Sequence, residues 1–205
     1  MCLFLETIKI EAGIMPHLKW HQQRLNKTFA HFYKEECAWN LGQIIHIPDV
    51  FQQGIVKCRM VYDDQTFQIE FSPYQIREIR RIQAVEIDTL DYTFKYAKRE
   101  SFQILQQQFP EADDILIVKN GFLTDSSYAN IALFDGQKWV TPNTFLLNGT
   151  CRQRLLAEKR ITEDEIRLKD LNRYQSVTFF NAMMDFGKGP SIKTEDIIPV
   201  RSGKL

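Results

Sequence analysis

The stretch that decides the fold is "DDILIVKNGFLTDSSYANIALFDGQKWVTP", which runs from residue 113 to residue 142. Its apolar runs are separated by Asn120-Gly121 and by Asp135-Gly136, and both dipeptides favour type I′ hairpin turns. The stretch therefore predicts three antiparallel strands that follow one another along the chain.

Further strands and helices are predicted on both sides. Strands are expected at 3–10, around Val85 and Ile87, and at 175–184, and a hairpin over 54–74 turns at Asp63-Asp64. Helices are expected at 15–33 with Pro16 in the first turn, at 96–109 and at 148–161. These elements predict an α/β or α+β chain with largely antiparallel or mixed sheets and flanking helices. We expect two lobes, a small N-terminal one over residues 1–76 and a larger C-terminal one over residues 77–205.

Composition excludes several classes of protein. The chain has 205 residues and a formal net charge of zero, which argues against binding nucleic acid by phosphate neutralisation. Its four cysteines form no C-x-x-C pair, so neither a disulfide framework nor a zinc site is expected. A reducing, cytoplasmic location is expected instead. The N-terminal residues do not resemble a signal peptide, and no apolar run has membrane-spanning length.

Lys95, in "DYTFKYAKRESF" (residues 91–102), is the first candidate for chemistry. Lysines are mostly solvated, so on position alone an ordinary surface charge is the commoner interpretation. Burial of the flanking Phe94 and Tyr96 would desolvate the amine and lower its pKa. Arg99 lies one helical turn further on in the predicted helix and would lower this pKa again.

Asp125 is the second candidate, because aspartate is disfavoured inside a strand. A bulge, or a turn made with Ser126 and Ser127, would explain it without function; a buried carboxylate facing a cation would be functional. The third candidate is "LLNGTCR" (146–152), where a helix start exposes N–H groups to an anion, unless Thr150 or Asn148 simply caps the helix.

The helix over 15–33 carries two further candidates. From its position alone, Arg24 is interpreted as a surface arginine of this helix. His17 and His21 share a helical face but lack the acidic partner of a zinc motif, so no metal is expected.

Taken in order, these segments resemble the class IV aminotransferases, pyridoxal 5′-phosphate (PLP) enzymes of fold type IV. "LFLETI" is similar to the opening strand of the family and "HLKWHQQRLNKT" to its H-x-x-R-L helix. "FKYAKRES" is similar to the segment with the Schiff-base lysine, and "NGFLTDSSYANIALF" to the segment with an acid and an asparagine. "WVTPNTFLLNGTCRQRLL" and "FFNAMM" resemble the two later motifs of the family.

The resemblance implies a role for each matched residue. Lys95, and not Lys98, would bond the cofactor and act as general base, and Asp125 would hold the pyridine nitrogen. Arg24 would bind the cofactor phosphate. The remaining cofactor contacts implied are Asn130, Gly149, Thr150, Cys151, and the backbone of Asn181 and Ala182.

The chain departs from the family at three points. Asp125 stands where glutamate is usual, Cys151 stands where threonine is common, and the leading hairpin of longer relatives is missing.

The family includes branched-chain aminotransferases, D-amino-acid aminotransferases and 4-amino-4-deoxychorismate lyases. "FFNAMM" favours the lyase, which makes p-aminobenzoate and pyruvate for folate synthesis. The alternatives are a class IV transaminase and a non-catalytic module that keeps the fold. The resemblance also implies a homodimer that acts on a small amino substrate.

Overall fold

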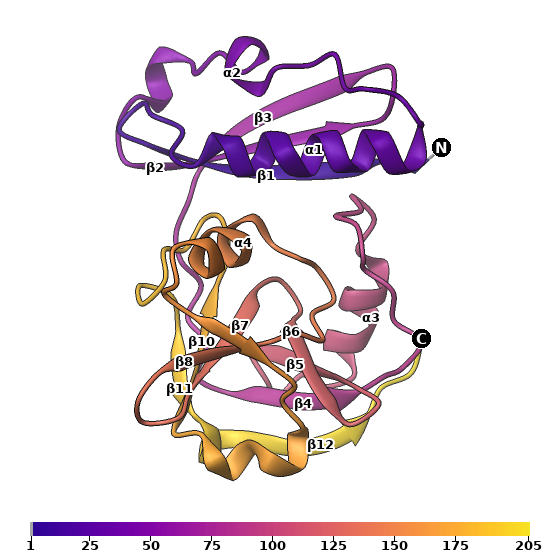
Figure 1. Cartoon of the computed structure of the whole chain (residues 1–205), viewed down its shortest axis with the longest axis vertical. Coiled ribbons are helices and arrows are strands. Elements are labelled where there is room, and N and C mark those ends of the chain that lie inside the picture. The colour runs from indigo at the N-terminus through magenta and orange to yellow at the C-terminus, as the bar shows by residue number, and fades with distance from the viewer. Residues whose placement is uncertain (1) are drawn as a thin grey trace. The chain divides into compact units, whose positions relative to one another are not determined.

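The computed structural model describes residues 2–205, which form two compact units (Figure 1). The first unit comprises the chain up to Gln75 together with Phe94–Lys98. The second comprises Ile76–Thr93 and Arg99–Leu205. Each unit has its own strands and its own buried apolar side chains, so each is described by itself.

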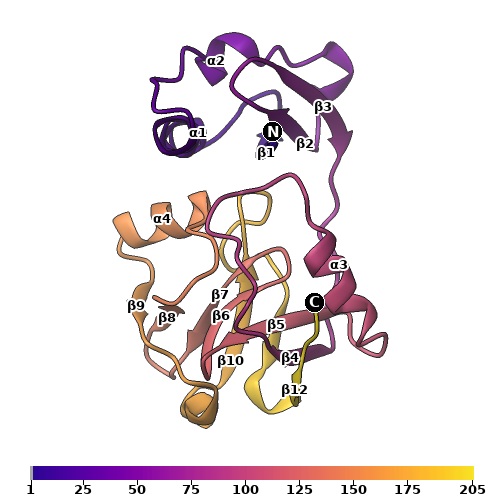
Figure 2. The ribbon, with the colours of Figure 1, turned by 90° about the vertical axis from the view of Figure 1, so that its right-hand side faces the viewer.

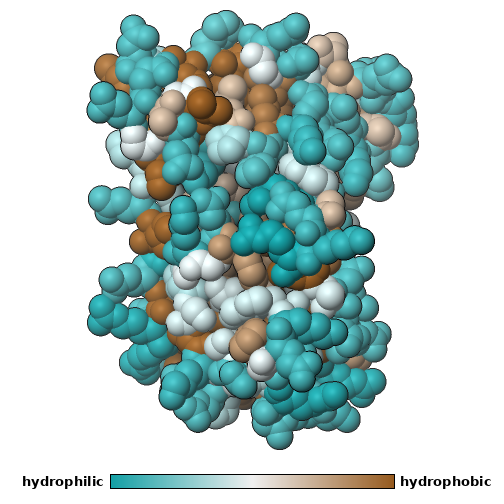
Figure 3. Space-filling model, turned by 60° about the vertical axis from the view of Figure 1, so that its left-hand side comes forward, coloured by the Kyte–Doolittle hydropathy of each residue, from teal (hydrophilic) through white to brown (hydrophobic). Residues whose placement is uncertain are grey.

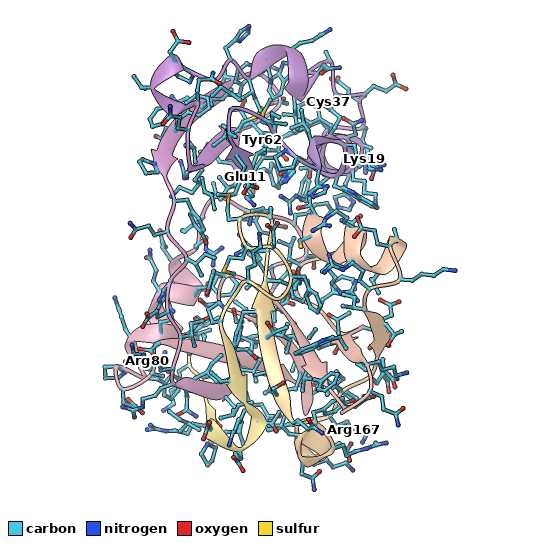
Figure 4. All side chains as sticks on the ribbon, turned by 90° about the vertical axis from the view of Figure 1, so that its left-hand side faces the viewer. Glu11, Lys19, Cys37, Tyr62, Arg80 and Arg167 are labelled. Atoms are coloured by element: carbon cyan, nitrogen blue, oxygen red, sulfur yellow. The ribbon has the colours of Figure 1, made fainter. Side chains whose placement is uncertain are left out.

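The first unit is an antiparallel sheet covered by a helix. The sheet has the order β1 (Phe4–Glu11), β2 (Ile55–Tyr62), β3 (Phe67–Pro73), and α1 (Leu18–Phe32) lies along it. The smaller helices are α2 (Leu41–Ile44) and η1 (Asp49–Phe51). Buried and half-buried residues alternate along β2, as expected of a strand with one face on a core. Tyr62 lies inside this core (Figure 4).

Two predicted details of the first unit have different outcomes. The β2–β3 hairpin turns where predicted, because the Asp63 carboxylate accepts the backbone N–H groups of Gln65 and Thr66. The prediction that Pro16 lies in the first helical turn is wrong. The helix begins at Leu18, after His17 in a left-handed conformation with φ 63°.

The second unit contains two mixed sheets flanked by helices α3 and α4 (Figure 2). Their strand orders are β12-β4-β5-β6 and β11-β10-β7-β8-β9. The strands of the first sheet are β4 (Ile82–Glu86), β5 (Asp114–Lys119), β6 (Phe122–Ser126) and β12 (Ile197–Ser202). Those of the second are β7 (Asn130–Phe134), β8 (Trp139–Pro142), β9 (Thr162–Asp164), β10 (Ser176–Phe180) and β11 (Ser191–Lys193). The helices are α3 (Glu100–Gln107), α4 (Thr150–Ala157), η2 (Leu168–Arg173) and η3 (Thr194–Asp196).

The stretch 113–142 forms four strands in two sheets, so the prediction of three consecutive antiparallel strands is wrong. β5 and β6 form one hairpin, and β7 and β8 form another in the second sheet. The chain leaves the first sheet after Ser126, because the Ser126 hydroxyl accepts the N–H groups of Tyr128 and Ala129. A serine that binds nearby backbone groups in this way competes with strand pairing.

The two turns of this stretch differ from each other. Asn120 and Gly121 both have positive φ, 51° and 78°, which is the predicted type I′ turn. In the second turn Gly136 has φ 98°, but Asp135 and Gln137 do not have positive φ. Asp135 N–H donates to the Lys138 carbonyl, so Gly136 occupies the first central position as in a type II′ turn.

The predicted helix 96–109 is shorter than expected, because Phe94–Lys98 is not helical and α3 begins at Glu100. The Lys95 carbonyl accepts a hydrogen bond from the Leu5 N–H at 2.9 Å, and the Ala97 N–H donates to the Leu3 carbonyl at 2.8 Å. This pairing adds the segment to the β1 edge. Lys95 therefore belongs to the first unit and not to the larger lobe predicted to carry it, and the division between the units falls at Gln75/Ile76. The mixed α/β fold itself is as predicted.

Most of the face shown in Figure 3 is hydrophilic, with smaller apolar areas between the polar side chains. Among large apolar side chains, Ile14 and Val50 are the most exposed of the described residues. Within residues 2–205, no helix is both long enough and apolar enough to cross a membrane.

Candidate active site

The first unit buries a cluster of charged side chains, Glu6, His21 and Arg24. Glu6 is fully buried on β1, and Arg24 and His21 reach it from α1. Arg24 donates from Nε to Glu6 Oε1 at 2.7 Å and from Nη2 to Oε2 at 2.5 Å. His21 Nδ1 lies 2.6 Å from Glu6 Oε2. A carboxylate can be buried here because a fork of two charge-assisted hydrogen bonds replaces its water.

The charges in this cluster follow from its contacts. Burial alone would raise the pKa of Glu6, but the charge and hydrogen bonds of Arg24, together with His21, outweigh burial and lower the pKa to about 2. Burial lowers the pKa of His21, while Glu6 opposes this effect and Arg24 and Lys95 add to it. At neutral pH the cluster therefore holds one anion, one cation and a neutral imidazole.

Lys95 lies in the same unit as this cluster, near enough for its charge to act on His21. Its side chain is half-buried, whereas Lys98 is exposed. The flanking aromatics pack as the sequence suggests. Phe94 contacts His31 with ring centroids 4.5 Å apart, and Tyr96 contacts Phe4 at 5.5 Å. The residue before Lys95 therefore packs against α1, and the residue after it packs against β1.

Arg99 does not lie on a helical face with Lys95, so that predicted arrangement is wrong. Arg99 is the N-cap of α3 and belongs to the second unit. It donates to the Ser127 carbonyl, and its guanidinium lies over the rings of Tyr92 and Phe102 at 5.4 and 4.7 Å. Residues 94–98 are not helical, so the i, i+4 geometry that the prediction required is absent.

Asp125 lies in a β-bulge of the second unit. Leu116 pairs with Ser126 and Val118 with Leu123, so Thr124 and Asp125 together stand opposite Ile117. The Thr124 hydroxyl donates to the Ile117 carbonyl at 2.8 Å. The structural interpretation of Asp125 as a bulge residue is therefore confirmed. Its carboxylate is also buried, so the bulge aims an acid into the interior of the unit.

Neutral donors, and not the predicted cation, hold the Asp125 carboxylate. Oδ1 accepts from the Asn130 amide at 2.7 Å, and Oδ2 accepts the N–H groups of Leu146 and Leu147 at 2.9 Å each. Burial raises the pKa of Asp125 to about 6, against the opposing effect of these donors and of the Arg152 charge. A carboxylate offers about four acceptor positions, so these three bonds leave capacity for one more donor.

Asn130 connects Asp125 to the start of α4. Its amide also donates to the Leu147 carbonyl at 2.8 Å. A Cβ added to Gly149 would lie 2.1 Å from Asn130 Oδ1, so the side chain of Asn130 requires glycine at position 149.

The start of α4 has no side-chain cap. Gly149 is the N-cap and has no side chain, and the predicted alternative of a cap by Thr150 or Asn148 is wrong. Asn148 instead accepts from Arg152 Nη1 at 3.2 Å. Thr150 and Cys151 are buried in the first turn, where backbone N–H groups lack intrahelical acceptors. Such a turn can bind an anion.

Asn181 and Ala182 follow β10 at the end where β7 begins, because Phe180 pairs with Asn130. The Asn181 amide donates to the Tyr128 carbonyl at 3.3 Å, and its oxygen accepts the N–H groups of Met183 and Met184. The second unit thus gathers Asp125, Asn130, Gly149 and Asn181 around the β6–β7 connection. Within residues 2–205 no group of three or more His, Cys, Asp or Glu is arranged to hold a metal ion.

Sequence reasoning gave no role to Glu6 or Arg152. Glu6 stands between apolar residues in "FLETI", and a charged residue at such a place on a strand signals a buried ion pair. Arg152 ends the quoted "GTCR", but nothing in its local sequence shows that it is buried.

Comparisons with known proteins place the chain among relatives of one kind. Residues 76–192 match the family described as amino-transferase class IV. A Haemophilus influenzae protein of uncharacterised function is 35% identical over 180 residues, which cover 87% of this chain and 96% of that protein.

Solved structures agree in fold. A Haemophilus somnus structure, described provisionally as a 4-amino-4-deoxychorismate lyase, is 32% identical with a TM-score of 0.84, over 92% of this chain and 98% of that one. A hypothetical aminotransferase from Mycobacterium tuberculosis, in a PLP-bound form, is 16% identical with a TM-score of 0.72, over 89% of this chain and 78% of that one.

Proposed function

This chain belongs to the amino-transferase class IV family, and we propose that it is a PLP-dependent 4-amino-4-deoxychorismate lyase. Besides "FFNAMM", the observation that carries the choice of the lyase within the family is the likeness to the Haemophilus somnus structure. That likeness reaches 32% identity and spans 98% of that chain. The proposed reaction forms p-aminobenzoate and pyruvate from aminodeoxychorismate.

The residues of the second unit fit the cofactor. The uncapped first turn of α4 suits a phosphate dianion, since its N–H groups point at any anion placed there. Gly149 leaves this approach open because it has no side chain. Asp125 is a buried acid with room for one further hydrogen-bond donor, such as a protonated pyridine nitrogen.

In the first unit, Arg24 is the residue proposed to bind the cofactor phosphate. Its Nε and Nη2, which form one edge of the guanidinium, donate hydrogen bonds to the Glu6 carboxylate. This fork fixes the plane of the guanidinium and so the direction in which its other edge points. We propose that Glu6 and His21 orient Arg24 for the phosphate.

PLP, when bound, supplies an electron-accepting ring that stabilises negative charge next to the substrate nitrogen. Asp125, with a pKa of about 6, is mostly ionised at neutral pH and can hold a proton on a ring nitrogen. The Lys95 amine is the proposed general base and acid, which takes a proton from the substrate and returns it. Asn130 keeps Asp125 in place while these protons move.

A class IV transaminase is the second candidate, because the match to the family extends over residues 76–192 and does not by itself select a reaction. Pyruvate release from aminodeoxychorismate in the absence of any 2-oxo acid separates the two. A lyase turns over repeatedly under these conditions. A transaminase stops after one half-reaction, and that outcome would replace the lyase proposal.

Matched lysine variants test the enzyme proposal as a whole. Lys95→Ala is expected to lose pyruvate release and the visible absorbance of bound PLP, while Lys98→Ala, which changes an exposed lysine in the same segment, keeps both. If the wild-type protein, incubated with PLP and then freed of unbound cofactor, shows no visible absorbance, the chain is a non-catalytic module. If Lys98→Ala removes the absorbance and Lys95→Ala does not, the lysine assignment is wrong.

We also propose, from the family resemblance, that the enzyme is a homodimer. Light scattering should give twice the chain mass of 24.2 kDa.

A further inference from the structure

Arg152 heads the described side chains that are large and fully buried, and neither the sequence motifs nor the proposed chemistry gives it a role. It is the third residue of α4 and lies in the same first turn as Thr150 and Cys151, the turn proposed to bind phosphate. Arginine is rarely buried unless its charge and donors are satisfied. The partners of Arg152 therefore show what its burial achieves.

These partners lie on the connection between β8 and α4, residues 143–148, and at its edge. Nη2 donates to the Pro142 carbonyl at 3.0 Å, where the connection begins. The guanidinium lies 4.3 Å from the centre of the Phe145 ring, in the middle of the connection. Nη1 donates to Asn148 Oδ1 at 3.2 Å, where the connection ends. One guanidinium therefore contacts the start, the middle and the end of this segment.

The same connection holds the Asp125 carboxylate. Leu146 and Leu147 provide the two backbone N–H groups that Oδ2 accepts. Backbone donors are strong only while the segment that carries them is held in one conformation. Any side chain that fixes residues 143–148 therefore acts on Asp125 through these two bonds.

We propose that Arg152 is a positioning residue that clamps residues 143–148, so that Leu146 and Leu147 hold the Asp125 carboxylate for its partner. That Asp125 contacts a cofactor rests on the proposed function. That Arg152 holds residues 143–148 in place does not depend on the proposed function. The charge of Arg152 also works against burial in setting the pKa of Asp125. Its Nε is buried and has no hydrogen-bond partner among the described residues. The guanidinium is therefore oriented so that it contacts residues 143–148, although this leaves one of its own donors unsatisfied.

A plain ion pair is the competing explanation. Arg152 Nη2 also contacts Glu163 Oε2 at 2.6 Å, but half of the Glu163 side chain is exposed. Glu163→Gln separates the two explanations, because it removes the anion and leaves the contacts to residues 142–148 in place.

The test compares Arg152→Met and Arg152→Lys with a matched control, Arg154→Met. Arg154 lies on the same helix and is also buried, but it contacts Glu158 and Cys151 and not the connection. The measurement is hydrogen exchange of the Leu146 and Leu147 amides by NMR in protein without cofactor. Methionine matches the length of arginine, and replacing a buried charge by an apolar side chain is often tolerated. Arg152→Lys serves if the methionine variant does not fold.

In the two Arg152 variants, exchange at both amides should become faster by about tenfold or more, because local opening becomes easier. This increase is counted after subtracting any change in the free energy of global unfolding. Arg154→Met and Glu163→Gln should leave these rates unchanged. Unchanged rates in both Arg152 variants would overturn the clamp. Equal acceleration in Arg154→Met or Glu163→Gln would also overturn it, because the effect would then belong to the helix or to the ion pair.

The dissociation constant of PLP, measured by absorbance, provides the second readout. It should rise about tenfold in Arg152→Met and stay unchanged in Arg154→Met. If the wild-type protein does not bind PLP, the proposed function fails, and the amide exchange result still decides the clamp. If PLP binds the wild-type protein and Arg152→Met equally while the amides loosen, the link from the clamp to the cofactor is refuted.

Discussion

Glu6 and Asp125 are both buried carboxylates, yet their pKa values move in opposite directions. Burial raises the pKa in each case. Burial is the largest single effect on Glu6, but the charge and the hydrogen bonds of Arg24, together with His21, outweigh it and stabilise the anion. Asp125 meets an amide and two backbone N–H groups, which are dipoles and only partly offset burial. The chain therefore keeps one acid permanently ionised and the other near the point of changing charge.

The pKa of Glu6 predicts a loss of stability in acid. Its folded-state pKa of about 2 lies below the ordinary 4.5, so Glu6 contributes stability that is present above pH 4.5 and lost as pH falls toward 2. Glu6→Gln should lower the free energy of unfolding at pH 7 by about 3 to 5 kcal/mol, because the buried Arg24 charge loses the carboxylate of Glu6. The difference from wild type, measured by denaturant unfolding, should shrink below pH 4.5.

Glu70→Gln is the control for this prediction. Glu70 lies on β3 of the same sheet and pairs with Arg59 at 3.3 Å, and the side chain of Glu70 is exposed and that of Arg59 partly exposed. Such a pair contributes about 0 to 1 kcal/mol. A similar loss in both variants would show that the Glu6 pair has no special weight.

The pKa of Asp125 predicts the opposite dependence on pH in protein without cofactor. Its folded-state pKa of about 6 exceeds the ordinary 3.8, so its contribution to stability is fully present below pH 3.8 and is lost as pH rises through 6. The loss is on the order of 3 kcal/mol, at about 1.4 kcal/mol per pKa unit. Asp125→Asn, which cannot ionise, should lack this dependence when unfolding is measured from pH 3.5 to 7.5. A wild-type carboxyl resonance that titrates near 4 would contradict the prediction.

At the scale of elements, the sequence predicted what depends on near neighbours. The Asn120-Gly121 turn, the hairpin at Asp63 and the helix after Gly149 form where predicted, because each is set by residues a few positions apart. The turn made with Ser126 and Ser127 was offered only as one explanation of Asp125, and the non-helical segment 94–98 was missed. At Ser126, hydrogen bonds to the serine hydroxyl compete with strand pairing, and at residues 94–98, pairing with the edge of β1 competes with helix formation. Local propensity does not determine which interaction forms.

The site follows the same division. Asp125 and Gly149 stand out in the sequence because each is unusual where it lies. Glu6 is also unusual, as a charged residue between apolar ones, but its partner Arg24 lies on another element. Arg152 does not stand out, because partners that explain its burial lie outside its own helix.

The junction of β7 and α4 predicts a severe effect of Gly149→Ala. The added Cβ would lie 2.1 Å from Asn130 Oδ1, so Asn130 must move, and its bond to Asp125 must break. Overpacking of this kind lowers the free energy of unfolding by about 1 to 3 kcal/mol. Chemical denaturation of the variant measures this loss.

A double variant distinguishes this clash from a change in helix propensity. Asn130→Ala removes the atom that the new Cβ would meet, so adding Gly149→Ala to it should cost much less than in wild type. Equal losses in the two backgrounds would show that Asn130 is not the reason for glycine. Gly42→Ala is a suitable control, because its Cβ would meet Asn40 Oδ1 at 3.3 Å.

At the scale of the whole molecule, the chain enters the second unit at Ile76, returns to the first for Phe94–Lys98, and leaves it again at Arg99. A single boundary in the sequence does not describe this path. The candidate residues are divided accordingly, with Glu6, Arg24 and Lys95 in the first unit and Asp125 and Gly149 in the second. The return places Lys95 next to Tyr96, which is bridged to Phe4 by the bonds from Leu5 N–H to the Lys95 carbonyl and from Ala97 N–H to the Leu3 carbonyl.

Native-state hydrogen exchange tests this division. Amides of one cooperative unit converge on a common free energy as denaturant is added. Ala97 N–H donates to Leu3, so its exchange should follow that of Met60 in β2. Gln103 N–H donates to Arg99 in α3 and should instead follow Leu116 in β5. Exchange of Ala97 together with Leu116 would assign the segment to the second unit. Convergence of all these amides on one free energy would show that the chain unfolds as a single unit.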